Sequence, residues 1–116
     1  MIVYYVTAHG FGHAVRACEV MRHLPPDVPL TVRSEVPEWL LRSELGGRPF
    51  ELIPARFDCG TLGPDSTSVD LKMTIDTAEP LLDANDQRLD AERTLLRRLG
   101  ARVVVADAPS FPLRAA

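Results

Sequence analysis

Residues 4–21, YYVTAHGFGHAVRACEVM, decide the fold of this chain. They begin inside an apolar run, Ile2 to Val6, which is too short for a helix and whose β-branched and aromatic residues favour a strand buried on both faces. A short loop with two glycines and two histidines follows. From His13 onward, apolar residues recur at helical spacing until the proline pair at 25–26 ends the pattern. The stretch therefore predicts a strand, a glycine-containing turn and a helix, which together open a βαβ unit.

The rest of the chain repeats this alternation. We expect strands at residues 30–33, 50–53 and 102–107, a helix at residues 37–47, and a long helix that begins at Pro80 and ends at Gly100. The apolar stripe of the long helix consists of Leu82, Leu89, Leu96 and Leu99. Residues 55–78 lack periodicity and are expected to form a loop. Strands that alternate with helices imply right-handed crossovers, so the expected fold class is α/β, a Rossmann-like parallel sheet of about four strands with flanking helices.

Size and composition limit the functions open to the chain. At 116 residues it has room for one domain, and its formal net charge of -3 argues against nucleic-acid binding, which needs a basic surface. Two cysteines are too few for a disulfide scaffold or a zinc site. No run approaches the ~20 apolar residues of a membrane span, and no leader pattern precedes the first strand. We therefore expect a cytoplasmic protein, and basic residues that are nearly all arginine suggest a bacterial genome rich in GC.

The last residues, PSFPLRAA, predict a loop that enters a helix and stops after barely a turn. Because the outer strand of such a sheet needs cover, we expect the chain to be the front part of a longer polypeptide. An unfinished sheet also leaves an open strand edge. One alternative to an enzyme is therefore a non-catalytic binding fragment whose sheet edge pairs with a partner or with a second copy of the chain.

The loop after the first strand lies where open α/β sheets bind ligands, outside the carboxyl ends of the strands. Gly10 and Gly12 allow the backbone to approach a ligand, and the N–H groups at the helix start favour an anion such as a diphosphate. Two alternatives remain open. The glycines serve only a tight turn, or they belong to the dinucleotide fingerprint of an oxidoreductase, with Glu35 on a ribose. Val15 stands where that fingerprint has its third glycine, which counts against the oxidoreductase.

Asp107 ends the fourth expected strand, and parallel strands share one rim for their carboxyl ends, so we expect this residue to meet His13. A carboxylate beside a histidine fixes the tautomer and supports the imidazolium that forms when the other ring nitrogen takes a proton. The two residues are thus a candidate general base and its orienting partner. The alternative is that Asp107 caps the next segment and His13 only packs. Glycines separate His9 from His13, so no metal site is expected there.

Three stretches, YYVTAHGFGHAVRACEVMRHL, DSTSVD and VVVADAPSF, together resemble the N-terminal domain of GT-B-fold glycosyltransferases. The resemblance is to the family-28-like group around the N-acetylglucosaminyltransferase of peptidoglycan synthesis, and also to the front of plant L-arabinokinases. It spans nearly the whole chain. Where those relatives carry DIPP, this chain has DAPSF, which changes the residues directly after Asp107.

The resemblance implies that residues 1–116 are part of the acceptor-side lobe of an inverting glycosyltransferase, incomplete and inactive without a donor-binding lobe. It implies His13 as general base with Asp107 as its partner, and it places the substrate-binding residues at Gly10, Gly12, Arg16, Asp65 and Ser66. The implied substrates are a nucleotide-sugar, commonly a UDP-sugar, and a sugar or glycan acceptor. A separate C-terminal lobe is the implied partner, and no metal or cofactor is needed.

Overall fold

The computed structural model describes residues 1–65 and 67–116. Strands and helices alternate along the chain as β1 (Ile2–Val6), α1 (Gly12–Arg22), β2 (Leu30–Arg33), α2 (Glu38–Leu45), β3 (Glu51–Ile53), α3 (Leu71–Arg98), β4 (Val103–Asp107) and α4 (Phe111–Ala115). Within the described residues, four strands form one sheet in the order β3-β2-β1-β4, and all neighbouring strands are parallel. The predicted α/β class, with about four parallel strands flanked by helices, is confirmed.

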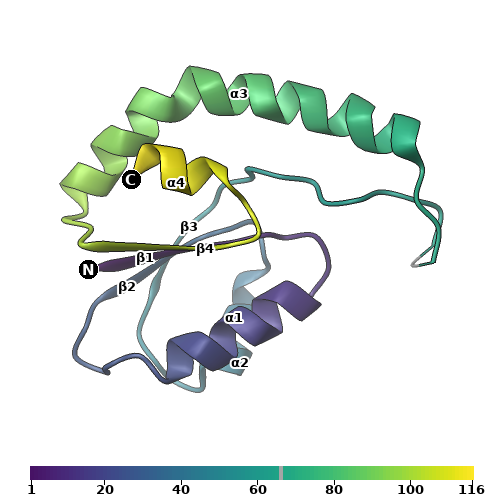
Figure 1. Cartoon of the computed structure of the whole chain (residues 1–116). Coiled ribbons are helices and arrows are strands. Elements are labelled where there is room, and N and C mark those ends of the chain that lie inside the picture. Colours follow the sequence, from purple (N-terminus) through teal and green to yellow (C-terminus); the bar gives the residue numbers. More distant parts are fainter. Residues whose placement is uncertain (66) are drawn as a thin grey trace.

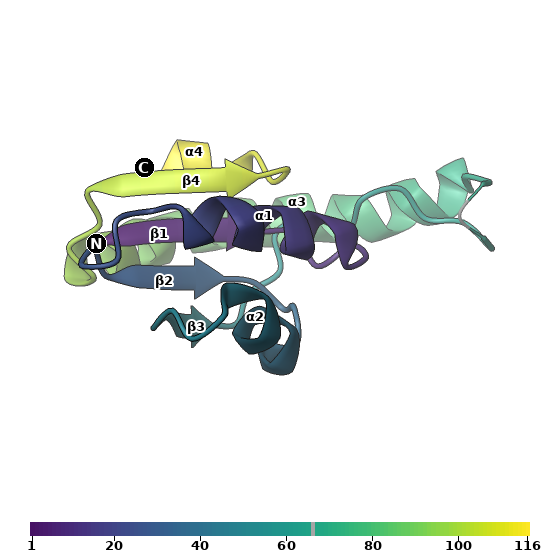
Figure 2. The same ribbon diagram turned by 90° about the horizontal axis from the view of Figure 1, so that it is seen from below.

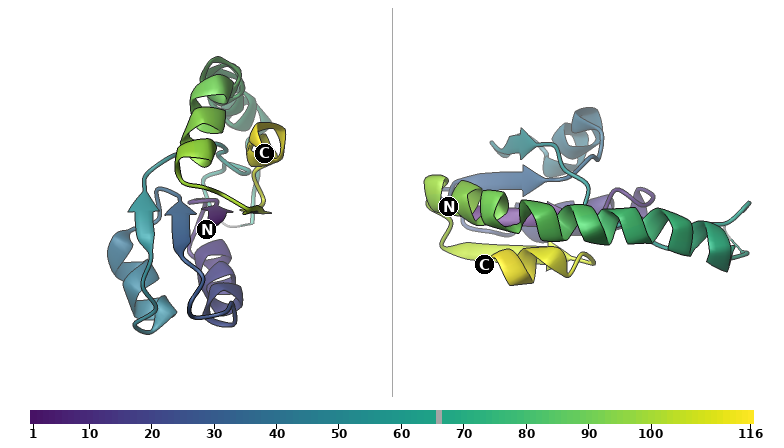
Figure 3. Two further views of the ribbon diagram at one scale, coloured as in Figure 1. Left: turned by 90° about the vertical axis from the view of Figure 1, so that its left-hand side faces the viewer. Right: turned by 90° about the horizontal axis from the view of Figure 1, so that it is seen from above.

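The sheet lies between two helical layers, α1 and α2 on one face and α3 and α4 on the other (Figures 1 and 3). Successive side chains of β1 point to opposite faces, as in any strand. Tyr4 and Val6 pack in the core beneath α1 and α2, whereas Val3 and Tyr5 pack in the core beneath α3 and α4. Both faces of β1 are therefore buried, which is why its sequence is an unbroken apolar run.

The long helix departs from the prediction, because α3 begins at Leu71 and not at Pro80. Residues 71–78, expected to belong to a loop, are helical. The carboxylate of Asp70 accepts a hydrogen bond from the Met73 N–H and so caps the helix. Pro80 costs the helix one internal hydrogen bond, but this residue is exposed and water can satisfy the carbonyl it leaves.

The first half of α3 extends beyond the carboxyl ends of the strands (Figure 2). Leu82, predicted as part of the buried stripe, is therefore 60% exposed. The face of α3 that lies over the sheet carries Asn85, Glu92 and Leu96 as its buried residues. Two of these three are polar, so the helix meets the sheet partly through hydrogen bonds.

The order of the strands singles out one position on the rim, the edge of the sheet formed by the carboxyl ends of the strands. That position lies between β1 and β4. From β1 the chain runs outward to β2 and β3, then returns to place β4 on the other side of β1. In open parallel sheets such a reversal opens a crevice between the carboxyl ends of the two strands concerned, and ligands bind there. The loops after β1 and β4 flank that crevice.

Candidate active site

His13 and Asp107 meet at this crevice. His13 lies in the first turn of α1, Asp107 is the last residue of β4, and 2.9 Å separates the imidazole Nδ1 from the carboxylate Oδ2. The side chains are 37% and 24% exposed, so the pair is partly covered and open to a ligand. The prediction that the two residues share one rim is confirmed. A carboxylate at Nδ1 holds the ring proton there, which leaves Nε2 as the nitrogen able to accept a proton.

Two neighbours of Asp107 have unusual properties, the backbone of Ala108 and the phenol of Tyr4. Ala108, directly after Asp107, has a φ of 73°, a left-handed conformation that costs a residue with a side chain about 1–2 kcal/mol. On the other side of the carboxylate, burial raises the pKa of the Tyr4 phenol, and the negative charge of Asp107 raises it further. Tyr4 therefore stays neutral at ordinary pH.

The glycines of the β1–α1 loop have different roles. Gly10 has a φ of +74°, so the turn itself explains this glycine. Gly12 has no such backbone requirement, and a Cβ placed there would have nothing within 4 Å among the described residues. Gly12 also begins α1, and no side chain among the described residues caps this helix start. The first backbone N–H groups of α1 therefore have no side-chain acceptor there, and the open space at the Cβ position of Gly12 lies next to His13 in the chain.

The loop after β3 braces the other side of the β1–α1 loop. The Thr7 hydroxyl donates to Asp58 Oδ1 at 2.9 Å and accepts from the His9 N–H at 3.3 Å. The His9 ring lies against Gly60, where a Cβ would be 2.6 Å from the ring carbon Cδ2. Gly60 is therefore required for this close approach, which the sequence did not reveal.

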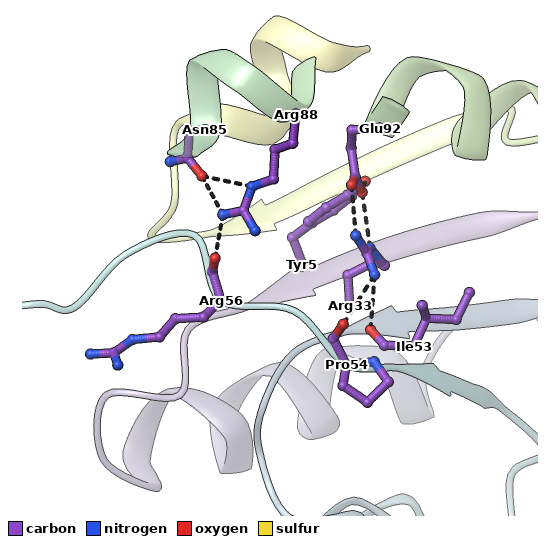
Figure 4. A network of polar contacts seen from close by, with 8 residues as sticks. All are labelled: Tyr5, Arg33, Ile53, Pro54, Arg56, Asn85, Arg88 and Glu92. Carbon is purple, nitrogen blue, oxygen red and sulfur yellow. Dashed lines mark hydrogen bonds and ion pairs between the residues drawn. The ribbon is translucent and has the colours of Figure 1, made fainter. Parts of the chain in front are cut away.

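A buried ion pair fastens α3 to the sheet (Figure 4). The Glu92 carboxylate accepts from Nε and Nη2 of Arg33 at 2.9 and 2.6 Å and from the Tyr5 hydroxyl at 2.6 Å. The Arg33 and Glu92 side chains are 8% and 4% exposed. Burial raises the pKa of Tyr5, and its hydrogen bond to the Glu92 carboxylate adds to the shift. The sequence does carry a signal for this contact. Glu92 lies three positions after Leu89 and four before Leu96, so a charged side chain interrupts the apolar face of the helix.

A second polar contact from α3 fixes the backbone that leads to Asp58 (Figure 4). The Asn85 amide donates to the Phe57 carbonyl at 2.9 Å, and Arg88 donates to both the Asn85 side chain and the Arg56 carbonyl. The Arg88 guanidinium also lies 4.2 Å from the centre of the Phe57 ring. The middle of α3 thereby sets where the loop after β3 reaches the rim.

No hydrogen bond or ion pair joins Arg16 or Asp65 to the His13–Asp107 pair among the described residues. Arg16 lies exposed on α1. Asp65 Oδ1 accepts hydrogen bonds from the N–H and hydroxyl groups of Thr67 and Ser68, which lower the pKa of Asp65 to about 2 and close a local turn. Ser66 lies outside the described residues. A substrate-binding role for these three residues remains a prediction.

Residues 1–65 and 67–116 contain no group of three or more histidine, cysteine, aspartate or glutamate side chains arranged to hold a metal ion. Across the same residues, no helix combines the length and apolarity needed to cross a membrane.

Comparison with known proteins finds a plant relative. The whole chain is 31% identical, over 118 aligned residues, to L-arabinokinase of Arabidopsis thaliana. The chain spans only 11% of the length of that protein. No protein-family profile matches the chain, and no solved structure matches it.

Proposed function

We propose that the chain is part of the acceptor-side lobe of an inverting glycosyltransferase with the GT-B fold, of the family-28-like group. The observation that carries the proposal is the His13–Asp107 pair, with 2.9 Å between Nδ1 and Oδ2, beside the open space at Gly12. A histidine oriented by a carboxylate at the switch point of a parallel sheet suits the deprotonation of a hydroxyl group. The nucleotide-sugar is held by a second lobe beyond the 116 residues.

The reaction follows from this geometry. His13 Nε2 takes the proton of an acceptor hydroxyl while its oxygen attacks the anomeric carbon of the donor sugar, and Asp107 supports the imidazolium that forms. The new glycosidic C–O bond forms as the bond from the anomeric carbon to the diphosphate breaks, which inverts that carbon. The departing nucleoside diphosphate, commonly UDP, gains negative charge. The N–H groups at the start of α1, beside Gly12, stabilise it.

A sugar kinase is the second reading of the same pair. The Arabidopsis relative is named for phosphorylating L-arabinose, and a base that activates a sugar hydroxyl serves phosphoryl transfer as well as glycosyl transfer. The relative therefore supports modification of a sugar hydroxyl and leaves the transferred group open. A panel of UDP-sugars assayed beside ATP separates the two reactions, since each requires its own donor.

The test is sugar transfer by the longer enzyme that this proposal requires. His13→Ala is expected to reduce turnover by about 10²–10⁴-fold, the usual contribution of a general base. His23→Ala is the matched control, because His23 follows the same helix and its side chain is 76% exposed. Near-normal turnover of the His13 variant would remove this residue from the mechanism, and transfer from ATP alone would establish the kinase.

A non-catalytic binding fragment is favoured by one specific observation, the open edge of β4. This strand is outermost in the sheet, and Val103 on it is 49% exposed. Its unpaired backbone groups can extend the sheet with a strand of a second copy. Light scattering after size exclusion, over a range of concentrations, would show a dimer that Val104→Pro disrupts by removing a backbone donor. A monomer at every concentration would exclude pairing of this edge with a second copy of the chain.

A further inference from the structure

A cavity of about 380 Å³ opens beside the β1–α1 loop, on the side away from β4. Its walls include Gly10 from the loop after β1, Glu35 from the segment after β2, and Arg56 and Asp58 from the segment after β3. The cavity therefore lies at the carboxyl ends of three neighbouring strands. Its volume is within the range of pockets that bind small molecules.

Three charged residues line this cavity, Glu35, Arg56 and Asp58. Glu35 is exposed at its edge, and Arg56 directs its side chain away from Arg88 (Figure 4), with Nε donating to the Asp58 carbonyl at 3.3 Å. The Asp58 carboxylate accepts from the Thr7 hydroxyl, and a carboxylate has capacity for several further hydrogen bonds. The wall thus offers acceptors at two carboxylates and donors at one guanidinium.

The charge of these groups selects the ligand. Besides the His9 imidazole, the polar lining consists of two carboxylates and one guanidinium, a net negative set that disfavours a phosphate or a nucleotide. The hydroxyl groups of a sugar can donate to the carboxylates and accept from the guanidinium, without bringing a charge of their own. A cationic ligand would have to approach Arg56. A neutral sugar is the ligand class that satisfies all three groups.

We propose that this cavity binds a neutral sugar ring through Glu35, Arg56 and Asp58. That the sugar is the acceptor of the transfer reaction rests on the function proposed above, whereas its binding does not. The Asp58 side of the site is ordered before the ligand arrives, because Thr7 fixes Asp58 and His9 packs on Gly60. This side therefore loses little conformational entropy on binding.

The experiment uses the 116-residue chain with ¹⁵N label. L-arabinose, D-glucose and N-acetylglucosamine are titrated separately, and amide shifts are followed in the NMR spectrum. At least one sugar is expected to shift the amides of Gly10, Glu35 and Asp58. Glu35→Gln is expected to weaken binding about tenfold or more, as for a lost hydrogen bond to a charged group. Glu38→Gln is the control, since Glu38 is also an exposed carboxylate and pairs with Arg42 on its own helix.

The outcomes separate this inference from the proposed function. The absence of shifts at the cavity with all three sugars, or equal affinity of the Glu35 and Glu38 variants, overturns the sugar site. UDP is titrated separately as a second probe. If UDP shifts the amides of Glu35 and Asp58 most strongly, the proposal of a neutral-sugar site is also overturned. If His13→Ala binds sugar normally in this assay and transfers it normally in the longer enzyme, the sugar site stands and the glycosyltransferase mechanism fails.

Discussion

Substitution of Glu92 measures how much the buried ion pair with Arg33 contributes to holding α3 on the sheet. Replacing it with glutamine keeps the size of the side chain and removes its charge. Arg33, 8% exposed, is then left without its ionic partner in the core. Leaving one member of a buried ion pair uncompensated costs about 3–5 kcal/mol. A domain of this size has a total stability of roughly 6–17 kcal/mol, so Glu92→Gln is expected to consume a large part of it.

Urea unfolding followed by far-UV circular dichroism measures this loss. With a urea dependence of ~2 kcal/mol per molar, the midpoint is expected to fall by about 2 M. Glu38→Gln provides the control, because its pair with Arg42 is also a salt bridge, with an N–O distance of 2.8 Å, but is exposed. That variant is expected to cost about 0.5 kcal/mol or less.

A double variant, Arg33→Met with Glu92→Leu, tests the reason for the effect. It removes both charges and is expected to recover part of the stability that Glu92→Gln loses. Recovery is partial because Arg33 also donates to the carbonyls of Ile53 and Pro54. A loss below about 1 kcal/mol for Glu92→Gln would refute the argument that an isolated buried charge dominates.

Two further predictions concern the loop and the core. Gly12→Ala is expected to leave the melting temperature unchanged or slightly higher, since alanine is the better helix former, and to abolish the amide shifts that UDP causes at the start of α1. Normal UDP shifts in that variant would show that the open space is not a ligand site. Burial raises the pKa of the Cys18 thiol from its ordinary 9.0 to about 11, so the unfolded chain loses this proton first and stability falls between about pH 9 and pH 11. Cys18→Ala should therefore show a flatter decline in urea midpoint over this window, and an unchanged slope would contradict the shift.

Much of the fold could be predicted from local patterns. The apolar runs of β1 and β4 and the helical spacing in α1 each depend on residues close together in sequence, and hydrophobic periodicity reports such elements directly. Their alternation implied a parallel sheet with all carboxyl ends on one rim. That general property was enough to bring His13 and Asp107 together, although 94 positions separate them.

Three features were decided by the tertiary structure alone. They are the residue at which α3 begins, the side chains that contact its buried face, and the polar residues that line the cavity at the carboxyl ends of the strands. Pro80 indicated a helix start, but the Asp70 cap and the exposure of this segment allow the helix to begin nine residues earlier. The Arg33–Glu92 pair and the cavity that Glu35 and Asp58 both line depend on how strands and helices pack side by side. Periodicity shows which face of an element is buried, whereas the identity of the side chain opposite depends on register and packing. For this reason the sequence alone determined the fold class and the rim where His13 meets Asp107, and only the packed structure revealed the polar cavity beside that rim.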